Sequence, residues 1–241
     1  MPAFASRITR PLLLATLLAT ATVTLQAQEA ASRQLAPGFS TRTADSRLLI
    51  LPADMELFSM SAGGVVEPRD DWTRAAQANF AAALEAQRQR LGSKVTRMNA
   101  AEADEFADIT TLHRAVADAV MIHHYGRGLM QLPTKQERLN WSLGDAVRPL
   151  KQRTGADYAL FTWVRDSYAS KERKAMMIGL AALGAISLGG EQVGYASLVD
   201  LNTGRIVWFN RLDRMSGDLR EPEPALETVD TLLKGFPTIQ P

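Results

Sequence analysis

The stretch from Gly155 to Leu212 constrains the fold more than any other part of the sequence. Its first part, Gly155 to Val164, is mostly apolar and predicts a buried strand. Its last part, Val193 to Leu212, predicts a hairpin, because the central Asn202, Thr203 and Gly204 tolerate the positive φ of a tight turn. These strands cannot be stable alone, so the rest of the chain must complete a sheet and cover it.

An apolar run, Ala175 to Leu188, separates the predicted strand from the hairpin and contains no charged residue. As a helix it would measure about 21 Å, shorter than the ~30 Å hydrocarbon core of a membrane. Three interpretations remain open: a helix packed on its own domain, a contact surface for a partner or a second copy, and membrane insertion. The side chains expected to make a partner or membrane contact are the large apolar ones: Met176, Met177, Ile178, Leu180, Leu183, Ile186 and Leu188.

The N-terminus has the pattern of a secretory signal peptide. Arg7 and Arg10 precede an apolar segment, and the small residue Ala27 suits cleavage after position 27. An uncleaved anchor is the alternative, although the apolar segment is short for a spanning helix. We therefore expect export by the general secretory route to the periplasm. Residues 28–45 are predicted to form a flexible leader.

Composition excludes several classes of function. The formal net charge is +1, and it becomes −1 after residues 1–27 are removed with their two arginines, so no nucleic-acid partner is expected. The chain has no cysteine, which excludes a cysteine nucleophile, thiolate metal sites and a bacterial lipid anchor.

The remaining pattern predicts a single domain over residues 46–235, with an apolar insertion at 175–190 and a short tail at 236–241. Strands are expected at 47–51 and 94–98. Helices are expected from Asp70 or Asp71 to Leu91, from the capping box of Asn99 and Glu102 to Tyr125, at 141–153 after a cap by Asn140, and at 225–234. Residues 53–69 and 126–140 are predicted loops, and 221–224 a rigid spacer. The expected fold class is α/β (α+β): a mixed three-layer sheet with helices packed on it and a C-terminal β-hairpin.

No motif for catalysis, a metal or a cofactor is found. His113, His123 and His124 lie on one predicted helix at spacings that cannot share a metal, and we interpret them as partly exposed residues near a helix end. Gly179 and Gly184 have phosphate-loop spacing, but the lysine that should follow is missing. Asp54 and Glu56 follow a predicted strand, where acids of α/β enzymes do occur.

Two parts of the sequence, the helix–strand transition Thr154 to Leu160 and the hairpin Leu198 to Trp208, carry a family resemblance. With the signal peptide and the early strand Leu48 to Leu51, they resemble the periplasmic superfamily that includes the curli-secretion pore lipoprotein (CsgG type), the N-terminal domain of the Tol–Pal translocation protein and the lipoprotein activators of penicillin-binding proteins. The resemblance implies an envelope protein, in the periplasm or associated with the outer membrane, that binds another envelope protein or assembles with itself.

Three hypotheses for function follow. The first is a non-enzymatic module for protein contact or self-assembly. The second is a periplasmic hydrolase or ligand-binding protein whose site is built from the loops at 53–69 and 126–140, with Asp54, Glu56 or a histidine in a pocket. The third is an oligomer that inserts residues 175–188 into a membrane.

Overall fold

The computed structural model describes residues 33–170, 172–173, 175–177 and 190–240. The expected signal peptide lies outside them, as do Ile178, Leu180, Leu183, Ile186 and Leu188 of the apolar run. Only Ala175, Met176 and Met177 of that run are described.

One mixed sheet organises the described chain, with β5 (Tyr158–Ala169) at its centre. On one side, β5 pairs in parallel with β1 (Leu48–Ile50) and, further along, with β2 (Asp54–Met60). On the other side, β6 (Gly190–Asp200) and β7 (Ile206–Arg214) follow in antiparallel order. The sheet is completed by β4 (Val95–Arg97), parallel to β1, and β3 (Val66–Pro68), antiparallel to β2.

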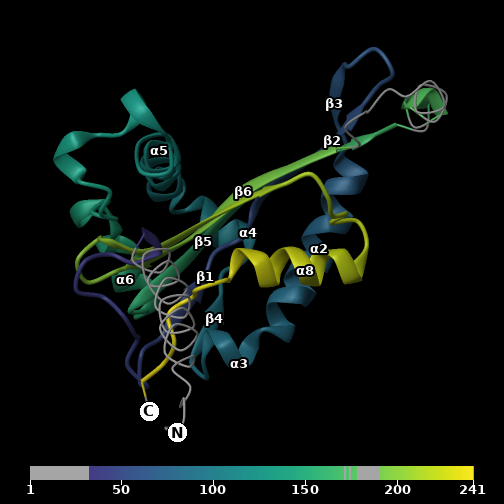
Figure 1. Cartoon of the computed structure of the whole chain (residues 1–241). Coiled ribbons are helices and arrows are strands. Elements are labelled where there is room, and N and C mark those ends of the chain that lie inside the picture. Colours follow the sequence, from purple (N-terminus) through teal and green to yellow (C-terminus); the bar gives the residue numbers. More distant parts are fainter. Residues whose placement is uncertain (1–32, 171, 174, 178–189, 241) are drawn as a thin grey trace, which may run out of the picture.

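Helices cover both faces, so the predicted α/β class with a C-terminal hairpin is confirmed (Figure 1). One face packs against α2 (Asp70–Ala86), α3 (Arg88–Leu91) and α8 (Pro222–Leu232), where Phe80, Leu91 and Val229 join the strands in a core. The other face packs against α4 (Ala100–Asp104), α5 (Ala107–His123) and α6 (Arg148–Thr154), through residues such as Ile109 and Leu150.

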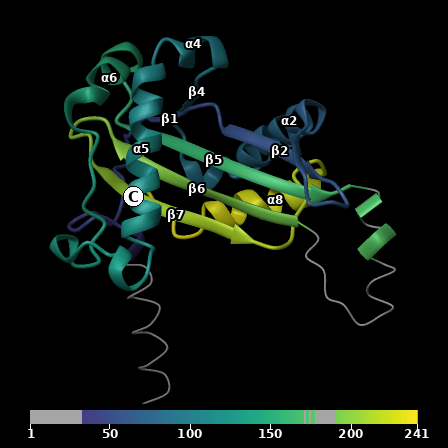
Figure 2. The same cartoon turned by 90° about the horizontal axis from the view of Figure 1, so that it is seen from above.

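The outer half of the sheet projects beyond α5. Figure 2 shows α5 crossing β5, β6 and β7 near one end, while β2 and the outer parts of β5 and β6 continue past it. We call β2, β3, Val164–Ala169 of β5 and Gly190–Gly194 of β6 the arm. Because β5 ends at Tyr168↔Gly190 in its pairing with β6, the insertion that contains the apolar run leaves and rejoins the sheet at the tip of the arm.

The segment between β1 and β2 contains one residue more than the part of β5 that it faces. Ile50 pairs with Leu160 and Asp54 pairs with Trp163, so the four-residue step from Ile50 to Asp54 opposes a three-residue step on β5. Pro52 lies in this bulge, and proline has no N–H to donate to a ladder. The bulge reverses the alternation of side chains: Leu51 packs in the α5 core, and four residues later Met55 packs against α2.

Several boundaries differ from the sequence prediction. Residues 53–69 are not a loop, because they contain β2 and β3; the apolar Met55 and Leu57 are buried strand positions. The helix predicted from Asn99 is divided at Glu105–Phe106 into α4 and α5, although its capping box is present.

The predicted helix at 141–153 begins only at Arg148, so Asn140 does not cap it. Three short 3-10 turns precede it: Gly128–Met130 (η1), Pro133–Lys135 (η2) and Gly144–Val147 (η3). Pro149 lies in the first turn of α6, where proline is tolerated because that turn needs no N–H donor. For the same reason residues 222–224 form the first turn of α8 and not a spacer.

The two ends of the described chain lie against the body. Ala36 N–H donates to the Val207 carbonyl (2.9 Å), and Arg42 pairs with Ile239 in a parallel bridge. The Arg42 side chain is buried over the Phe236 ring and donates to the carbonyls of Pro237 and Arg90. Burial lowers the pKa of Arg42 to about 10. Residues 35–42 and 236–240 therefore hold each other in place beside β7.

Candidate functional site

A cavity of about 380 Å³ lies where the arm leaves the two helix layers. We call it the Asp54 cavity. Its walls come from the bulge before β2, the α4–α5 region and the middle of β5 and β6: Leu51, Pro52, Ala53, Asp54, Ala103, Asp104, Ala107, Thr110, Thr111, His113, Arg114, Phe161, Thr162, Trp163 and Tyr195. The volume falls within the range of small-molecule sites.

The bulge explains how a carboxylate reaches this place. After the extra residue, Asp54 and Glu56 face the same side of the sheet as Trp163 and Arg165, toward α5, while Met55 turns to the α2 core. Without the bulge the alternation along this edge would place Asp54 on the opposite face. Asp54, which follows shortly after β1 in the sequence, therefore lies at the rim of a cavity.

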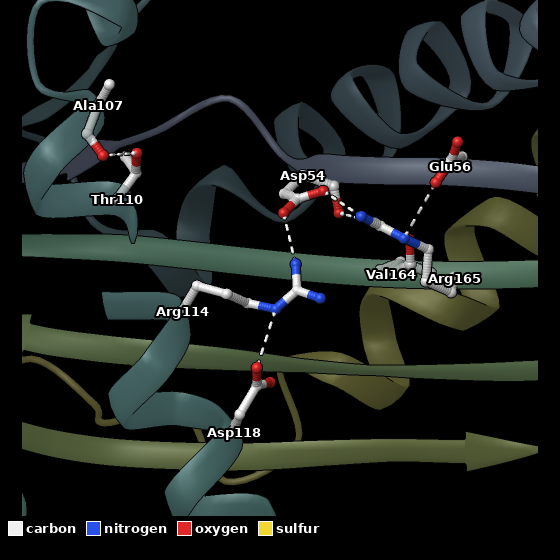
Figure 3. Close-up of polar contacts among 8 residues, drawn as sticks. All are labelled: Asp54, Glu56, Ala107, Thr110, Arg114, Asp118, Val164 and Arg165. Carbon is white, nitrogen blue, oxygen red and sulfur yellow. Dashed lines mark hydrogen bonds and ion pairs between the residues drawn. The ribbon is translucent and has the colours of Figure 1, made fainter. Parts of the chain in front are cut away.

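Asp54 joins two arginines from different elements (Figure 3). Arg114 of α5 donates to Asp54 Oδ2 (Nη1, 2.8 Å), and Arg165 of β5 donates to Asp54 Oδ1 (Nη2, 2.7 Å). Arg114 also reaches Asp118, one turn further along α5 (3.3 Å), and Arg165 lies 3.5 Å from Glu56. The network ties α5 to the base of the arm.

Trp163 lies between the two arginines. The guanidinium carbons of Arg114 and Arg165 lie 4.5 Å and 5.0 Å from its ring centroid, within the range of cation–π contacts. The Trp163 ring also stacks on Tyr195, with centroids 5.5 Å apart. Aromatic rings therefore form the floor below the charged network.

His113 is the buried polar residue of the cavity. It is 3% exposed, stacks on Phe161 at 3.9 Å, and its Nε2 lies 2.6 Å from Ser197 Oγ on β6. Burial, with a smaller effect of Arg114, lowers the pKa of His113 to about 3, so the imidazole is neutral at pH 7. Burial also raises the pKa of Tyr195 above its usual value.

The prediction of partly exposed helix-end histidines is wrong for two of the three. His113 lies in the middle of α5 and is buried, and so is His124, which donates from Nε2 to the Arg33 carbonyl (2.8 Å). Burial lowers the pKa of His124. His123 donates from Nδ1 to the Met130 carbonyl (2.7 Å) and anchors the segment after α5.

The predicted two-loop site is only partly correct. Asp54 and a histidine do line one cavity, but residues 126–140 contribute nothing to it, and Glu56 lies beside it in the charged network. Sequence reasoning missed Arg114, Arg165, Trp163 and Tyr195. One available signal was the Arg114 and Asp118 pair at helical i, i+4 spacing. Another was Arg165, which directly follows the mostly apolar stretch Tyr158 to Val164.

Within the described residues, no group of three or more His, Cys, Asp or Glu side chains could hold a metal ion. None of the described helices has the length and hydropathy needed to cross a membrane.

Comparison with known proteins gives only distant structural similarity. The sequence matches no protein-family model and no curated protein. Similar solved structures include the PelC dodecamer from Paraburkholderia phytofirmans (13% identity, covering 83% of this chain and 96% of that chain, TM-score 0.36). Another is the lipoprotein GNA1162 from Neisseria meningitidis (16% identity, covering 71% of this chain and 81% of that chain, TM-score 0.29). A third is the LpoB C-terminal domain from Escherichia coli (13% identity, covering 78% of this chain and 93% of that chain, TM-score 0.29). At these identities and scores no function is transferred from them.

Proposed function

We propose that this protein is exported to the periplasm of a bacterium and acts there without catalysis, by binding another envelope protein or further copies of itself. The projecting arm carries this proposal. The insertion with the apolar run starts and ends at its tip, and no residue of 175–177 belongs to either core.

Exposed apolar side chains gather at the described part of the tip. Val65 and Val66 are 58% and 49% exposed, and Met176 is 42% exposed. Val66 on β3 pairs with Met60 on β2, which pairs with Ala169 at the end of β5, so Val66 is two strands away from the point where the insertion begins. Apolar side chains that remain in water at the end of a rigid sheet are typical of a contact surface.

The contact residues that we propose are those expected from the sequence: Met176, Met177, Ile178, Leu180, Leu183, Ile186 and Leu188. The family resemblance to CsgG-type and Tol-type periplasmic modules supports the same class of function. Membrane insertion of residues 175–188 by an oligomer is the competing use of the same surface.

The Ser197 and His113 pair gives little support to the hypothesis of a periplasmic hydrolase. Ser197 is fully buried, so a substrate cannot reach its hydroxyl, and no described carboxylate is hydrogen-bonded to His113 to orient it as a base. The pair is better explained as a buried polar contact between α5 and β6.

The test is the size of the protein in solution. Light scattering on protein extracted from the periplasm, with and without detergent, should give a defined oligomer or a stable heteromeric complex. Replacing residues 175–188 by a Gly-Ser linker of equal length should give a monomer with an unchanged circular dichroism spectrum. Oligomers that require detergent would favour membrane insertion instead.

Site-specific photocrosslinking in cells gives an independent measurement. A crosslinker at Val65 or Met176 should capture a discrete adduct, while one at Leu226, which is 41% exposed on α8, should not. A monomer in solution, together with no adduct at either arm position, would contradict the proposal.

A further inference from the structure

The Asp54 cavity contains buried hydrogen-bonding groups that the protein itself does not satisfy. Tyr195 is 1% exposed and lines the cavity, yet its hydroxyl has no hydrogen-bond partner among the described residues. Two atoms of the lining residues are fully buried with no partner there, Trp163 Nε1 and Thr162 Oγ1. Buried polar groups in native proteins are nearly always paired, so such groups beside a cavity indicate a bound molecule or water.

His113 adds another group, and the surroundings determine its tautomer. Its Nε2 contacts Ser197 Oγ, which has no other hydrogen-bond partner among the described residues. If Nε2 carried the proton, the buried Ser197 hydrogen would have no acceptor, at a free-energy cost. The serine hydroxyl therefore donates to Nε2, and the proton of the neutral ring is on Nδ1. That N–H has no described partner, and His113 lines the cavity.

Most of the unpaired groups can only donate, whereas the hydroxyls of Thr162 and Tyr195 can also accept. The Nδ1–H of His113 and the indole N–H of Trp163 can only donate, and Arg114 Nη2 makes no hydrogen bond to a described residue (Figure 3). The Thr110 hydroxyl already donates to the Ala107 carbonyl (3.0 Å). A ligand that satisfies the cavity must therefore present acceptors.

The charges around the cavity disfavour an anion. Asp54, Glu56 and Asp118 outnumber Arg114 and Arg165, with which they are paired, and the exposed Asp104 adds another negative charge at the rim. An ammonium group would suit this potential, but it brings only donors to a site that already has too many. A neutral acceptor avoids both conflicts.

The apolar part of the lining defines the rest of the molecule. Phe161 and Trp163 supply flat rings, and Leu51, Pro52 and the alanines of α4 and α5 complete an apolar wall. We propose that the Asp54 cavity binds a small neutral molecule that combines a flat apolar body with a carbonyl or comparable hydrogen-bond acceptor. This site is separate from the contact surface at the arm tip and does not depend on it.

Three probes of one shape test the proposal: benzamide, benzoate and benzylamine. Each is titrated into ¹⁵N-labelled protein, and amide and indole signals are followed by NMR. Benzamide should shift the Trp163 indole signal and amides of Thr111, His113 and Tyr195, with at least fivefold higher affinity than either charged probe. Equal affinity of benzamide and benzylamine, or shifts confined to other surfaces, would overturn the proposal.

Two variants locate the site. Tyr195→Phe removes only the unpartnered hydroxyl and should weaken benzamide binding at least threefold. The control is Tyr158→Phe, because Tyr158 lies on the same sheet, contacts the α2 core and does not line the cavity.

Thr111→Trp, at an exposed position of the cavity wall, should abolish the shifts by filling the space. Benzamide affinity that is unchanged in both Tyr195→Phe and Thr111→Trp would place the binding elsewhere.

Discussion

The inner and outer halves of the sheet are built from the same strands but are buried differently. In β5 every residue from Ala159 to Thr162 is buried, whereas from Trp163 to Ser167 buried and half-exposed residues alternate. The same change occurs in β7, which is continuously buried from Ile206 to Asn210 and alternates beyond it. The inner half is covered by helices on both faces, and the arm only on the face of α2 and α8.

The border between the halves carries the charged network around Asp54. At this border α5 no longer covers the sheet. It is here that Trp163, Arg114 and the bulge before Asp54 lie. A sheet face that emerges from under a helix must change from apolar to polar within one or two residues, and here it does so with paired charges. The cavity results from the same transition, because the bulge displaces the edge beside β5.

A matched pair of phenylalanines gives the largest expected difference between the halves. Phe161 is 4% exposed under α5, and Phe58 is half-buried on the same face of the arm. Phe161→Ala should lower the free energy of unfolding by about 3–5 kcal/mol, and Phe58→Ala by about 1 kcal/mol. Urea denaturation followed by circular dichroism measures both. Equal losses would mean that the arm is as tightly covered as the inner half.

The inner half should weaken in acid because of His113. Its folded-state pKa of about 3 lies below the unfolded value of 6.5, so the unfolded state takes up a proton first as the pH falls. This group alone should cost about 3 kcal/mol of unfolding free energy between pH 6.5 and pH 4. His113→Gln should be less stable at pH 7 but should lose less on acidification. A parallel pH dependence in both proteins would contradict the buried neutral imidazole.

The arm should respond to pH in the opposite direction through Asp166. This carboxylate is 2% exposed on the α2 face and accepts hydrogen bonds from Tyr168 and from Gln192 (2.6 Å), with Asp218 and Arg220 nearby. Burial raises the pKa of Asp166 to about 6. Its stabilising contribution is thus complete below pH 3.8 and is lost as the pH rises through 6.

Asp166→Asn tests this sign. It should raise the free energy of unfolding at pH 7.5 by about 2 kcal/mol and have little effect at pH 4. Denaturation at the two pH values measures the difference, and Asp213→Asn, at an exposed position near the end of β7, is the control. Destabilisation at pH 7.5 would show that the charged form is needed to hold Tyr168 and Gln192.

The charged network at the border should have the smallest effect on stability. Arg114, Asp54 and Asp118 are 36–52% exposed, and ion pairs in water contribute little. Arg114→Met should change the free energy of unfolding by no more than about 1 kcal/mol, and less at 0.5 M salt than at low salt. A loss of several kcal/mol would show that these exposed ion pairs stabilise the protein far more than exposed pairs usually do.

Much of the fold could be predicted from the sequence because its signals are local. The apolar strand at β5, the turn at Asn202–Gly204, the capping box of Asn99 and Glu102, and the stop at Gly155 each depend on neighbouring residues. Propensity and periodicity report such features directly. By contrast, β2 was predicted as a loop, since Pro52 and two glycines surround it and the strand that places it in the sheet, β5, is more than 100 residues away.

The candidate site depended on tertiary structure for a different reason. The sequence identified Asp54 as an acid after a strand, and the histidines as residues of one helix. A one-residue bulge determines which face Asp54 occupies, and the crossing of α5 over β5 and β6 determines that His113 meets Ser197 and Arg114 meets Asp54. Contacts between side chains 60 or more residues apart leave no periodic signal in the sequence, because they arise only when the packed elements bring those side chains together.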